Sequence, residues 1–265
     1  MTDTDKALLT RVERVVRQAM EMARAMSPQR THRKAHQDFV TDIDLEVDRF
    51  LEAALGALIA DCPVLSEERA VQHRAALAQY WIVDPIDGTL NMMSGLPFYG
   101  VSVALVDARG PKLAVVGAVA QDELYSAIRG AGAWKDGAAL GLTGGAPDLI
   151  VLSTGLLDRL VGRHPEIYRA LRKVGKIRNL GAQALHICGV AQGSFAGVAS
   201  LEARIWDEAA AGLITREAGG VWRSRADGQD WTRPAALMAV TEQRSIAAHP
   251  DVAARLQRLL APVFG

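Results

Sequence analysis

One stretch, residues 81–91, constrains the fold of this chain more than any other. It begins with the apolar run Trp-Ile-Val and continues directly into Asp-Pro-Ile-Asp-Gly-Thr, which is typical of a buried strand that ends in a turn. Pro85 fixes one φ angle, and Gly88 allows a backbone conformation that other residues resist. The turn therefore holds two carboxylates, Asp84 and Asp87, close together on a rigid corner.

The same turn carries groups that can bind a phosphate. Thr89 supplies a hydroxyl, and the amides of Gly88 and Thr89 would face an anion if a helix begins here. Carboxylates beside such donors indicate a divalent cation that bridges the protein and a phosphate. An ordinary Asp-Gly turn between two strands is the alternative that this stretch alone leaves open.

The composition is that of a globular chain with a large core. Of its 265 residues 49% are apolar, and 30 acidic residues balance 30 basic ones. We expect one extended domain or two closely packed subdomains, and no dedicated nucleic-acid binder. Cys62 and Cys188 lack the spacing of a zinc site or a disulfide framework. Residues 1–5 are polar and no apolar run reaches membrane-spanning length, so we expect a cytoplasmic protein without membrane association.

Hydrophobic periodicity predicts helices early in the chain and a meander of strands after the central stretch. Apolar residues from Leu8 to Met26 recur at helical spacing, and Thr41 or Asp42 would cap a second helix. The basic segment 30–34 between these helices is expected to be a loop. Strands are expected at 62–65, 99–106, 113–121, 123–128 and 133–134.

The second half of the chain alternates between strands and helices. Strands are expected at 149–153, 176–178, 195–199 and 237–240, and helices at 165–174, 181–191, 206–218 and from about residue 251. The Gly-rich segment 141–147 indicates a hinge, which divides one compact unit into an N-terminal half, 1–145, and a C-terminal half, 146–265. A meander followed by α/β alternation predicts layered helices and sheets.

Five acidic residues lie at element ends or turns. They are Asp44, Glu67, Asp84, Asp87 and Asp207. If these side chains converge, they cannot all be buried as anions without cations. Mg²⁺ suits such hard oxygen ligands and keeps part of its water shell. Taken singly, each residue is also explained as a helix cap or a solvated charge.

Short motifs follow one another in a fixed order along nearly the whole chain. They are Lys34 with Asp38-Phe39-Val40-Thr41-x-x-Asp44; Ser66-Glu67-Glu68; Trp81-x-x-Asp84-Pro85-Ile86-Asp87-Gly88-Thr89-x-Asn91; Pro97-Phe98; Gly181; and Trp206-Asp207 with Glu217-Ala218-Gly219-Gly220. This ordered set resembles the inositol monophosphatase family of Mg²⁺-dependent, lithium-sensitive phosphatases. The resemblance implies an α/β (α+β) fold, a layered α-β-α-β-α sandwich shared with fructose-1,6-bisphosphatase, and a homodimer.

The resemblance also implies which residues hold two to three Mg²⁺ ions. The ligands would be Glu67, Asp84, the carbonyl of Ile86, Asp87 and Asp207. Asp44 would orient Thr89 through a hydrogen bond. Lys34 would offset the negative charge of the cluster, with Arg33 as the alternative. The N-terminal half would therefore carry most ligands, and the C-terminal half would add Asp207 and the substrate loop.

The expected reaction is the hydrolysis of a phosphate monoester by metal-activated water. Glu67 would hold the Mg²⁺ that activates the water, and Thr89 and Glu67 would position and deprotonate that water. The three aspartates of the ligand set would hold a second ion at the leaving oxygen, and a third, weakly held ion would assist. The amides of Gly88 and Thr89 would bind phosphate oxygens. No covalent phosphoenzyme is required.

The substrate-binding part departs from the family pattern. Gly181-Ala182-Gln183-Ala184 stands where the family often has Gly-Ser-Ala-Ala or Gly-Thr-Ala-Ala. Inositol phosphatases have a glutamate seven residues before the aspartate of Trp-Asp; here that residue is Ser200, and Glu202 either replaces it or is a surface charge. A site that hydrogen-bonds a hydroxyl discriminates strongly, so these changes bear on specificity. The expected substrate contacts are Asp87, Gly88, Thr89, Gly181, Ala182, Gln183, Ser200 and Asp207.

Two classes of function remain at this stage. The first is a phosphatase of a small phosphorylated metabolite, by default inositol monophosphate, with histidinol phosphate, adenosine 3′,5′-bisphosphate and sugar phosphates as alternatives. The second is a regulatory or binding protein that kept the fold and lost efficient catalysis. A missing metal ligand would mark the second class, and every ligand position is filled, which favours the first.

Overall fold

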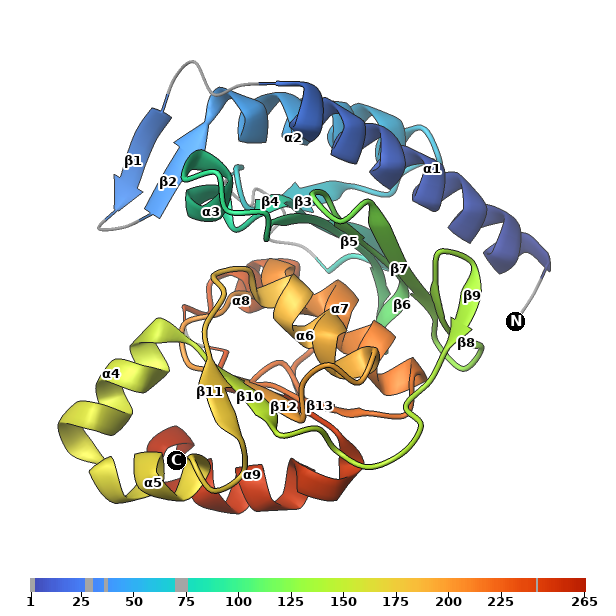
Figure 1. Ribbon diagram of the computed structural model, residues 1–265. Coiled ribbons are helices and arrows are strands. Elements are labelled where there is room, and N and C mark those ends of the chain that lie inside the picture. The colour runs from blue at the N-terminus through green and yellow to red at the C-terminus, as the bar shows by residue number, and fades with distance from the viewer. Residues whose placement is uncertain (1–2, 27–30, 36–37, 70–75, 242) are drawn as a thin grey trace.

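Helices and sheets alternate in layers, in the order helix, sheet, helix, sheet, helix (Figure 1). The computed structural model describes residues 3–26, 31–35, 38–69, 76–241 and 243–265, with backbone only at 32–35 and 38. The predicted layered α-β-α-β-α sandwich is therefore confirmed. Among the described helices, none combines the length and hydropathy that crossing a membrane requires.

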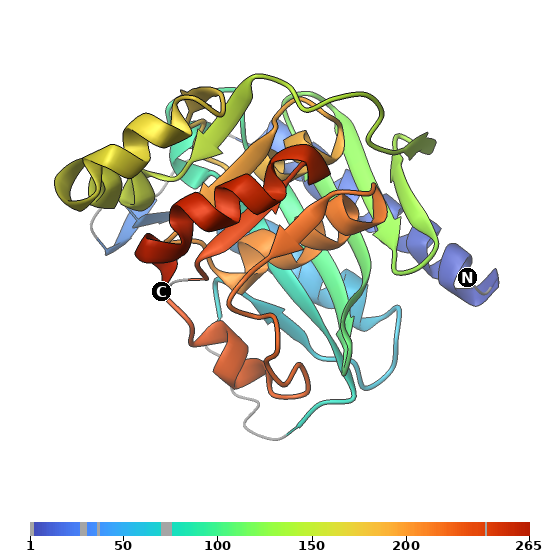
Figure 2. The same ribbon diagram turned by 90° about the horizontal axis from the view of Figure 1, so that it is seen from below.

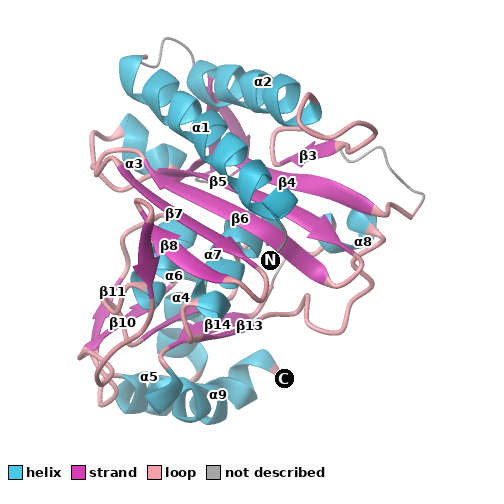
Figure 3. Cartoon of the chain, turned by 90° about the vertical axis from the view of Figure 1, so that its right-hand side faces the viewer, coloured by secondary structure: helices cyan, strands magenta, loops and turns pink. Residues whose placement is uncertain are grey.

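The first sheet is covered on one face by α1 (Asp3–Ala25) and α2 (Asp42–Gly56) (Figures 1 and 3). Its seven strands are, in spatial order, β3 (Val64–Ser66), β4 (Gln79–Asp87), β5 (Gly100–Asp107), β6 (Gly110–Ala118), β7 (Glu123–Ile128), β8 (Gly132–Lys135) and β9 (Ala138–Leu140). Trp81 and Val83 pack toward α1 and α2, whereas Tyr80 and Ile82 pack on the opposite face. Both faces of β4 are thus buried, which explains its continuous apolar run.

Two helices, α6 (Gln183–Ala191) and α7 (Ile205–Glu217), form the middle layer between the sheets (Figures 1 and 3). Small residues let α7 approach its neighbours closely. A Cβ added at Gly212 would lie 2.2 Å from the ring of Trp222 in the second sheet. Only glycine fits at this position without a shift of the indole.

The second sheet has five strands. In spatial order they are β11 (Lys176–Arg178), β10 (Leu149–Leu152), β12 (Gly197–Ser200), β14 (Ser245–Ala248) and β13 (Val221–Arg223). The outer helices α4 (Thr154–Arg163), α5 (Pro165–Leu171) and α9 (Pro250–Phe264) cover its far face, with α9 crossing the strands (Figure 2). The connection between the two sheets runs from residue 141 to 148, near the predicted boundary of the halves; the division of the chain at 145/146 stays a prediction.

Three short pieces border the first sheet and the middle layer. A hairpin of β1 (Thr31–Ala35) and β2 (Asp38–Thr41) leads into α2, and Thr41 caps α2 as predicted. The helix α3 (Thr89–Met93) follows β4, and α8 (Pro234–Met238) precedes β14.

Two predictions of secondary structure are wrong. Residues 31–34 form strand β1 rather than a loop, because their backbone pairs with β2 despite the basic side chains; Arg30 lies outside the described residues. Residues 237–240 are not a strand. Pro234 begins a helix there, consistent with its fixed φ, and the buried Leu237 and Met238 belong to that helix.

Candidate active site

The predicted corner at the end of β4 contains an extra residue. In the pairing of β4 with β5, Asp84 faces Ser102 and Asp87 faces Gly100, so three steps on one strand match two on the other. Residues three apart on a regular strand point to opposite faces, and the irregularity lets both aspartates line the same cavity. Gly88 then adopts φ 89° and becomes the N-cap of α3.

Carboxylates from both halves of the chain meet at this corner. Oxygens of Glu67, Asp84 and Asp207 all lie within 4.8 Å of one another. Glu67 follows β3, Asp84 lies three residues before the end of β4, and Asp207 lies in the first turn of α7. Asp84 is only 2% exposed. Three hard oxygen donors at this spacing fit a divalent cation.

The electrostatics show how unfavourable this cluster is without cations. Burial raises the pKa of Asp84 well above its ordinary value, and the negative charges of Glu67, Asp87 and Asp207 raise it further. Burial, with the charges of Asp87 and Glu67, likewise raises the pKa of Asp207. Each carboxylate thus disfavours ionisation of its neighbours, which is the situation that a bound cation relieves.

Asp87 is held differently from the other carboxylates. The backbone N–H of Gln183 donates to its Oδ1 at 3.0 Å, and that of Ala184 donates to its Oδ2 at 2.7 Å. Burial raises the pKa of Asp87 to about 7, although these amide hydrogen bonds oppose the shift. Each carboxylate oxygen keeps a lone pair for a further partner. The start of α6 therefore fixes the Asp87 carboxylate and leaves both of its oxygens able to accept a further partner.

Thr89 lies between Asp44 and the corner. Its hydroxyl donates toward Asp44 Oδ1 at 2.7 Å and lies 3.0 Å from the carbonyl of Ile86. Asp44 is itself fixed, because its Oδ2 accepts from the backbone N–H of Thr41 at 2.9 Å. The structure therefore brings Thr89 and Asp44 into direct contact beside the carboxylate cluster.

Two adjoining cavities make up the candidate site. The first, of about 370 Å³, is lined by Glu67, Asp84, Ile86, Asp87, Gly88, Thr89 and Asp207, together with Phe39, Leu90, Gly181, Glu202, Arg204 and Trp206. The second, of about 260 Å³, shares Asp87, Gly181, Glu202 and Asp207 with the first and adds Ala182, Gln183, Ser200 and other polar residues. The predicted ligands and substrate contacts thus line one continuous hollow.

Glu202 and Ser200 differ in their access to this hollow. Ser200 is 1% exposed, and its hydroxyl accepts from the N–H of Ala203. Glu202 is exposed and lines both cavities. The hydroxyl of Ser153 donates to it at 2.6 Å, as does the N–H of Gly155 at 2.9 Å. These bonds hold the Glu202 carboxylate in place at the cavity wall.

Sequence reasoning missed several cavity residues. Arg204 lines the first cavity, where its guanidinium lies 5.8 Å from the ring of Trp206 and donates to the carbonyl of Val240. Asn179 and Thr154 line the second and hydrogen-bond each other at 2.8 Å. Only Arg204 had a sequence signal, a charge three residues before the Trp-Asp aspartate.

The side chains of Lys34 and Arg33 lie outside the described part of the structure, so their role stays a prediction.

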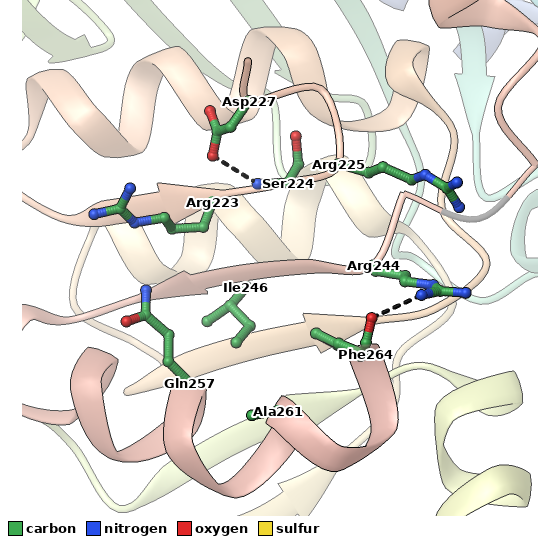
Figure 4. Close-up of a pocket in the computed structure, with 9 residues that line it drawn as sticks. All are labelled: Arg223, Ser224, Arg225, Asp227, Arg244, Ile246, Gln257, Ala261 and Phe264. Atoms are coloured by element: carbon green, nitrogen blue, oxygen red, sulfur yellow. Dashed lines mark hydrogen bonds between the residues drawn. The ribbon is translucent and has the colours of Figure 1, made fainter. Parts of the chain in front are cut away.

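A larger cavity of about 540 Å³ lies between β13, β14 and α9, lined by Arg223, Arg225, Arg244 and six further residues (Figure 4). Asp227 is its one described carboxylate and pairs with Arg216 at 2.7 Å. Size alone therefore does not identify the acidic site.

The layered fold and the acidic hollow define an α/β protein that gathers carboxylates near a strand end, in an arrangement that fits a divalent cation. Comparison with known proteins narrows this class. A sequence model described as the inositol monophosphatase family matches residues 1–262. The chain belongs to the inositol monophosphatase family.

Individual relatives carry two kinds of name. The inositol-1-monophosphatase of Rhizobium meliloti is 35% identical over 206 residues, covering 74% of this chain and 75% of the relative. The Nus factor SuhB of Xylella fastidiosa is 33% identical over 193 residues, covering 71% and 69%. The crystal structure of the extragenic suppressor protein suhB from Bartonella henselae superposes with a TM-score of 0.80 at 25% identity, covering 96% of this chain and 98% of that one.

Proposed function

We propose that this protein is a Mg²⁺-dependent phosphomonoesterase of a small phosphorylated metabolite. The observation that carries the proposal is the convergence of Glu67, Asp84 and Asp207 within 4.8 Å beside the start of α3. The raised pKa values of Asp84 and Asp207 support a bound cation, because burial and the neighbouring carboxylates, Glu67 among them, disfavour the ionised form of each. The donor set consists of oxygen atoms, as Mg²⁺ prefers.

Each predicted residue has a role in this proposal. Glu67, Asp84, Asp87, Asp207 and the carbonyl of Ile86 would hold two to three Mg²⁺ ions. Bound Mg²⁺ would neutralise phosphate oxygens and lower the pKa of a water molecule. Thr89 and Glu67 would orient that water and accept its proton, and the amides of Gly88 and Thr89 would face the phosphate. Lys34 would offset the negative charge of the cluster.

The Thr89–Asp44 contact gives a direct test of the proposed water-orienting role. We expect Thr89→Val to lower the rate of phosphate release by about a hundredfold or more at saturating Mg²⁺, because valine keeps the shape and removes the hydroxyl. Thr89→Ser retains the hydroxyl and is expected to stay within about tenfold of the wild type. Initial rates with each variant measure the difference. Equal rates for the valine and serine variants would exclude a role for the hydroxyl.

The alcohol part of the substrate would occupy the second cavity. Glu202, rather than the buried Ser200, is our proposed acceptor for its hydroxyl groups, because Ser153 and Gly155 hold that carboxylate at the wall. Gly181, Ala182 and Gln183 line the same cavity. Inositol monophosphate is the default substrate, and histidinol phosphate, adenosine 3′,5′-bisphosphate and sugar phosphates are the alternatives.

A substrate panel tests the proposal as a whole. We expect phosphate release from at least one of inositol 1-phosphate, histidinol phosphate, adenosine 3′,5′-bisphosphate and fructose 1,6-bisphosphate. Release should require Mg²⁺, stop in EDTA and fall when Li⁺ is added. Activity confined to one member would identify the substrate. A homodimer belongs to the same proposal, as it rests on the family resemblance.

The other class of function remains the alternative if the panel fails. Several relatives are named Nus factors, and a regulatory role on this fold would not require turnover. Absence of phosphate release from every substrate at saturating Mg²⁺ would contradict the phosphatase proposal and favour that role. Mg²⁺ binding measured on the same protein separates a lost metal site from a wrong choice of substrate.

A further inference from the structure

A buried carboxyl group lies directly behind the candidate metal site. Glu208 follows Asp207 on α7, but its side chain is 0% exposed and contacts other partners. The hydroxyl of Ser245 in β14 donates to Glu208 Oε1. The side-chain amide of Gln183 donates to the same oxygen at 3.0 Å. Glu208 thus joins α7 to α6 and to the second sheet.

Gln183 makes hydrogen bonds in two directions. Its backbone N–H donates to Asp87 at the end of β4, and its side chain donates to Glu208. The next amide, of Ala184, completes the contact with Asp87. One residue at the start of α6 therefore connects a proposed metal ligand of β4 with the neighbour of Asp207, the proposed ligand of α7.

This arrangement has a geometric consequence. Asp87 is fixed by the first turn of α6, and Asp207 is fixed by the position of α7. The Gln183–Glu208 hydrogen bond joins these two helices. Gln183 is hydrogen-bonded to Asp87, and Glu208 follows Asp207 in the chain. Glu208 is fully buried and Gln183 half-buried, so breaking the bond would remove one of the hydrogen bonds to Glu208 Oε1 at a place that water does not reach, and the contact resists displacement.

We infer that Gln183 and Glu208 are positioning residues that set the spacing of Asp87 and Asp207 for Mg²⁺. The inference rests on the proposed metal site, but it does not depend on which phosphate ester is the substrate. Neither residue is expected to touch the reacting atoms in this role. Outer contacts of this kind orient metal ligands, and their loss lowers metal affinity.

Direct measurement of Mg²⁺ binding tests the inference without turnover. Isothermal titration of EDTA-stripped protein would compare the wild type with Gln183→Leu, which keeps a similar bulk and loses the amide. We expect the Mg²⁺ dissociation constant to rise about tenfold. Glu208→Gln retains the oxygen that accepts from Gln183 and Ser245, so its dissociation constant should stay within about twofold of the wild type.

The chain offers a matched control on the same helix. Gln192 lies at the other end of α6, where its amide donates to Ser194 at 2.8 Å and its carbonyl oxygen accepts from Tyr125. Gln192→Leu removes equivalent side-chain bonds far from the ligands. We expect it to bind Mg²⁺ like the wild type. If the substitutions acted only by loosening α6, Gln183→Leu and Gln192→Leu would both weaken Mg²⁺ binding.

A double variant covers the case in which Gln183→Leu fails to fold. Gln183→Leu with Glu208→Leu replaces both polar partners by apolar ones and leaves no unpaired carboxylate. It should fold, as judged by thermal unfolding in EDTA, and still bind Mg²⁺ about tenfold more weakly. If Gln183→Leu, alone or together with Glu208→Leu, binds Mg²⁺ with the wild-type dissociation constant, the inference is overturned. Absence of Mg²⁺ binding by the wild type removes the metal site and the inference together.

Discussion

Replacing Asp84 with asparagine is expected to reduce phosphate release at saturating Mg²⁺ by about a thousandfold, equivalent to about 4 kcal/mol of activation free energy. Asp84 is the most buried member of the carboxylate cluster, and its oxygen lies within 4.8 Å of oxygens of Glu67 and Asp207. Asparagine keeps the shape and the oxygen that accepts from the N–H of Ile86. The variant therefore removes the charge that would hold the cation and little else.

The control for this experiment is Asp158→Asn on the exposed face of α4. It makes the same chemical change away from the acidic hollow and should leave the rate unchanged. Rates are measured with the substrate that the panel identifies, over a range of Mg²⁺ concentrations. An Asp84→Asn enzyme with wild-type rates at saturating Mg²⁺ would refute the assignment of the metal site.

The second large effect concerns stability. Without metal, thermal stability is expected to fall as the pH rises from about 4 to about 7. The folded pKa of Asp87 is raised to about 7 from an ordinary value of 3.8. In this window the folded protein holds a proton that the unfolded chain has lost, so a rise in pH favours unfolding. The buried Asp84 adds to the effect in the same direction.

Bound Mg²⁺ should reverse this loss, because it supplies the positive charge that the proton supplies at low pH. At a concentration about a hundredfold above the dissociation constant, binding stabilises by roughly 2.7 kcal/mol, or about 5–10 °C in Tm for a chain of this size. The increase in Tm on addition of Mg²⁺ should be larger at about pH 8 than at about pH 5, because protons compete with Mg²⁺ for the carboxylates at the lower pH.

Differential scanning calorimetry in EDTA and in Mg²⁺ measures both parts of this prediction. Asp87→Asn removes one titrating group and should flatten the pH dependence of the metal-free protein. Asp158→Asn should leave that dependence as it is. An unchanged Tm on addition of Mg²⁺ at about pH 8 would show that the cluster does not bind the ion.

Periodicity predicted most of the first half of the fold, whereas helix α4 and strands β13 and β14 of the second half were not predicted. The amphipathic pattern of α1 and the apolar run of β4 are strong local signals, because each element buries a defined face. Strand β1 carries a basic sequence and is held by pairing with β2, which no local pattern reveals. Residues 237–240 are apolar enough for a strand, but the proline at 234 begins a helix.

The site could be predicted in part for a similar reason. The aspartates at 84 and 87 lie three residues apart at the irregular end of β4, so their proximity is a local property of the sequence. Glu67 and Asp207 reach the same point only through the fold, and the family motifs supplied that step. The contacts of Glu202 with Ser153 and of Gln183 with Glu208 join residues far apart in the chain. Such partners depend on how the layers pack and leave no pattern in one sequence.

The packing of α7 between the two sheets limits how this protein can evolve. Asp207 takes its position from a helix whose Gly212 lies against Trp222 of the second sheet, while Asp84 lies in the first sheet and Glu67 directly follows one of its strands. A larger residue at 212 would displace α7 and, with it, one edge of the ligand set. Sequence drift in the interior is therefore constrained by the geometry of the site as well as by folding. Loss of the need for the ion would remove the first constraint and leave the second, the close contact of Gly212 with Trp222.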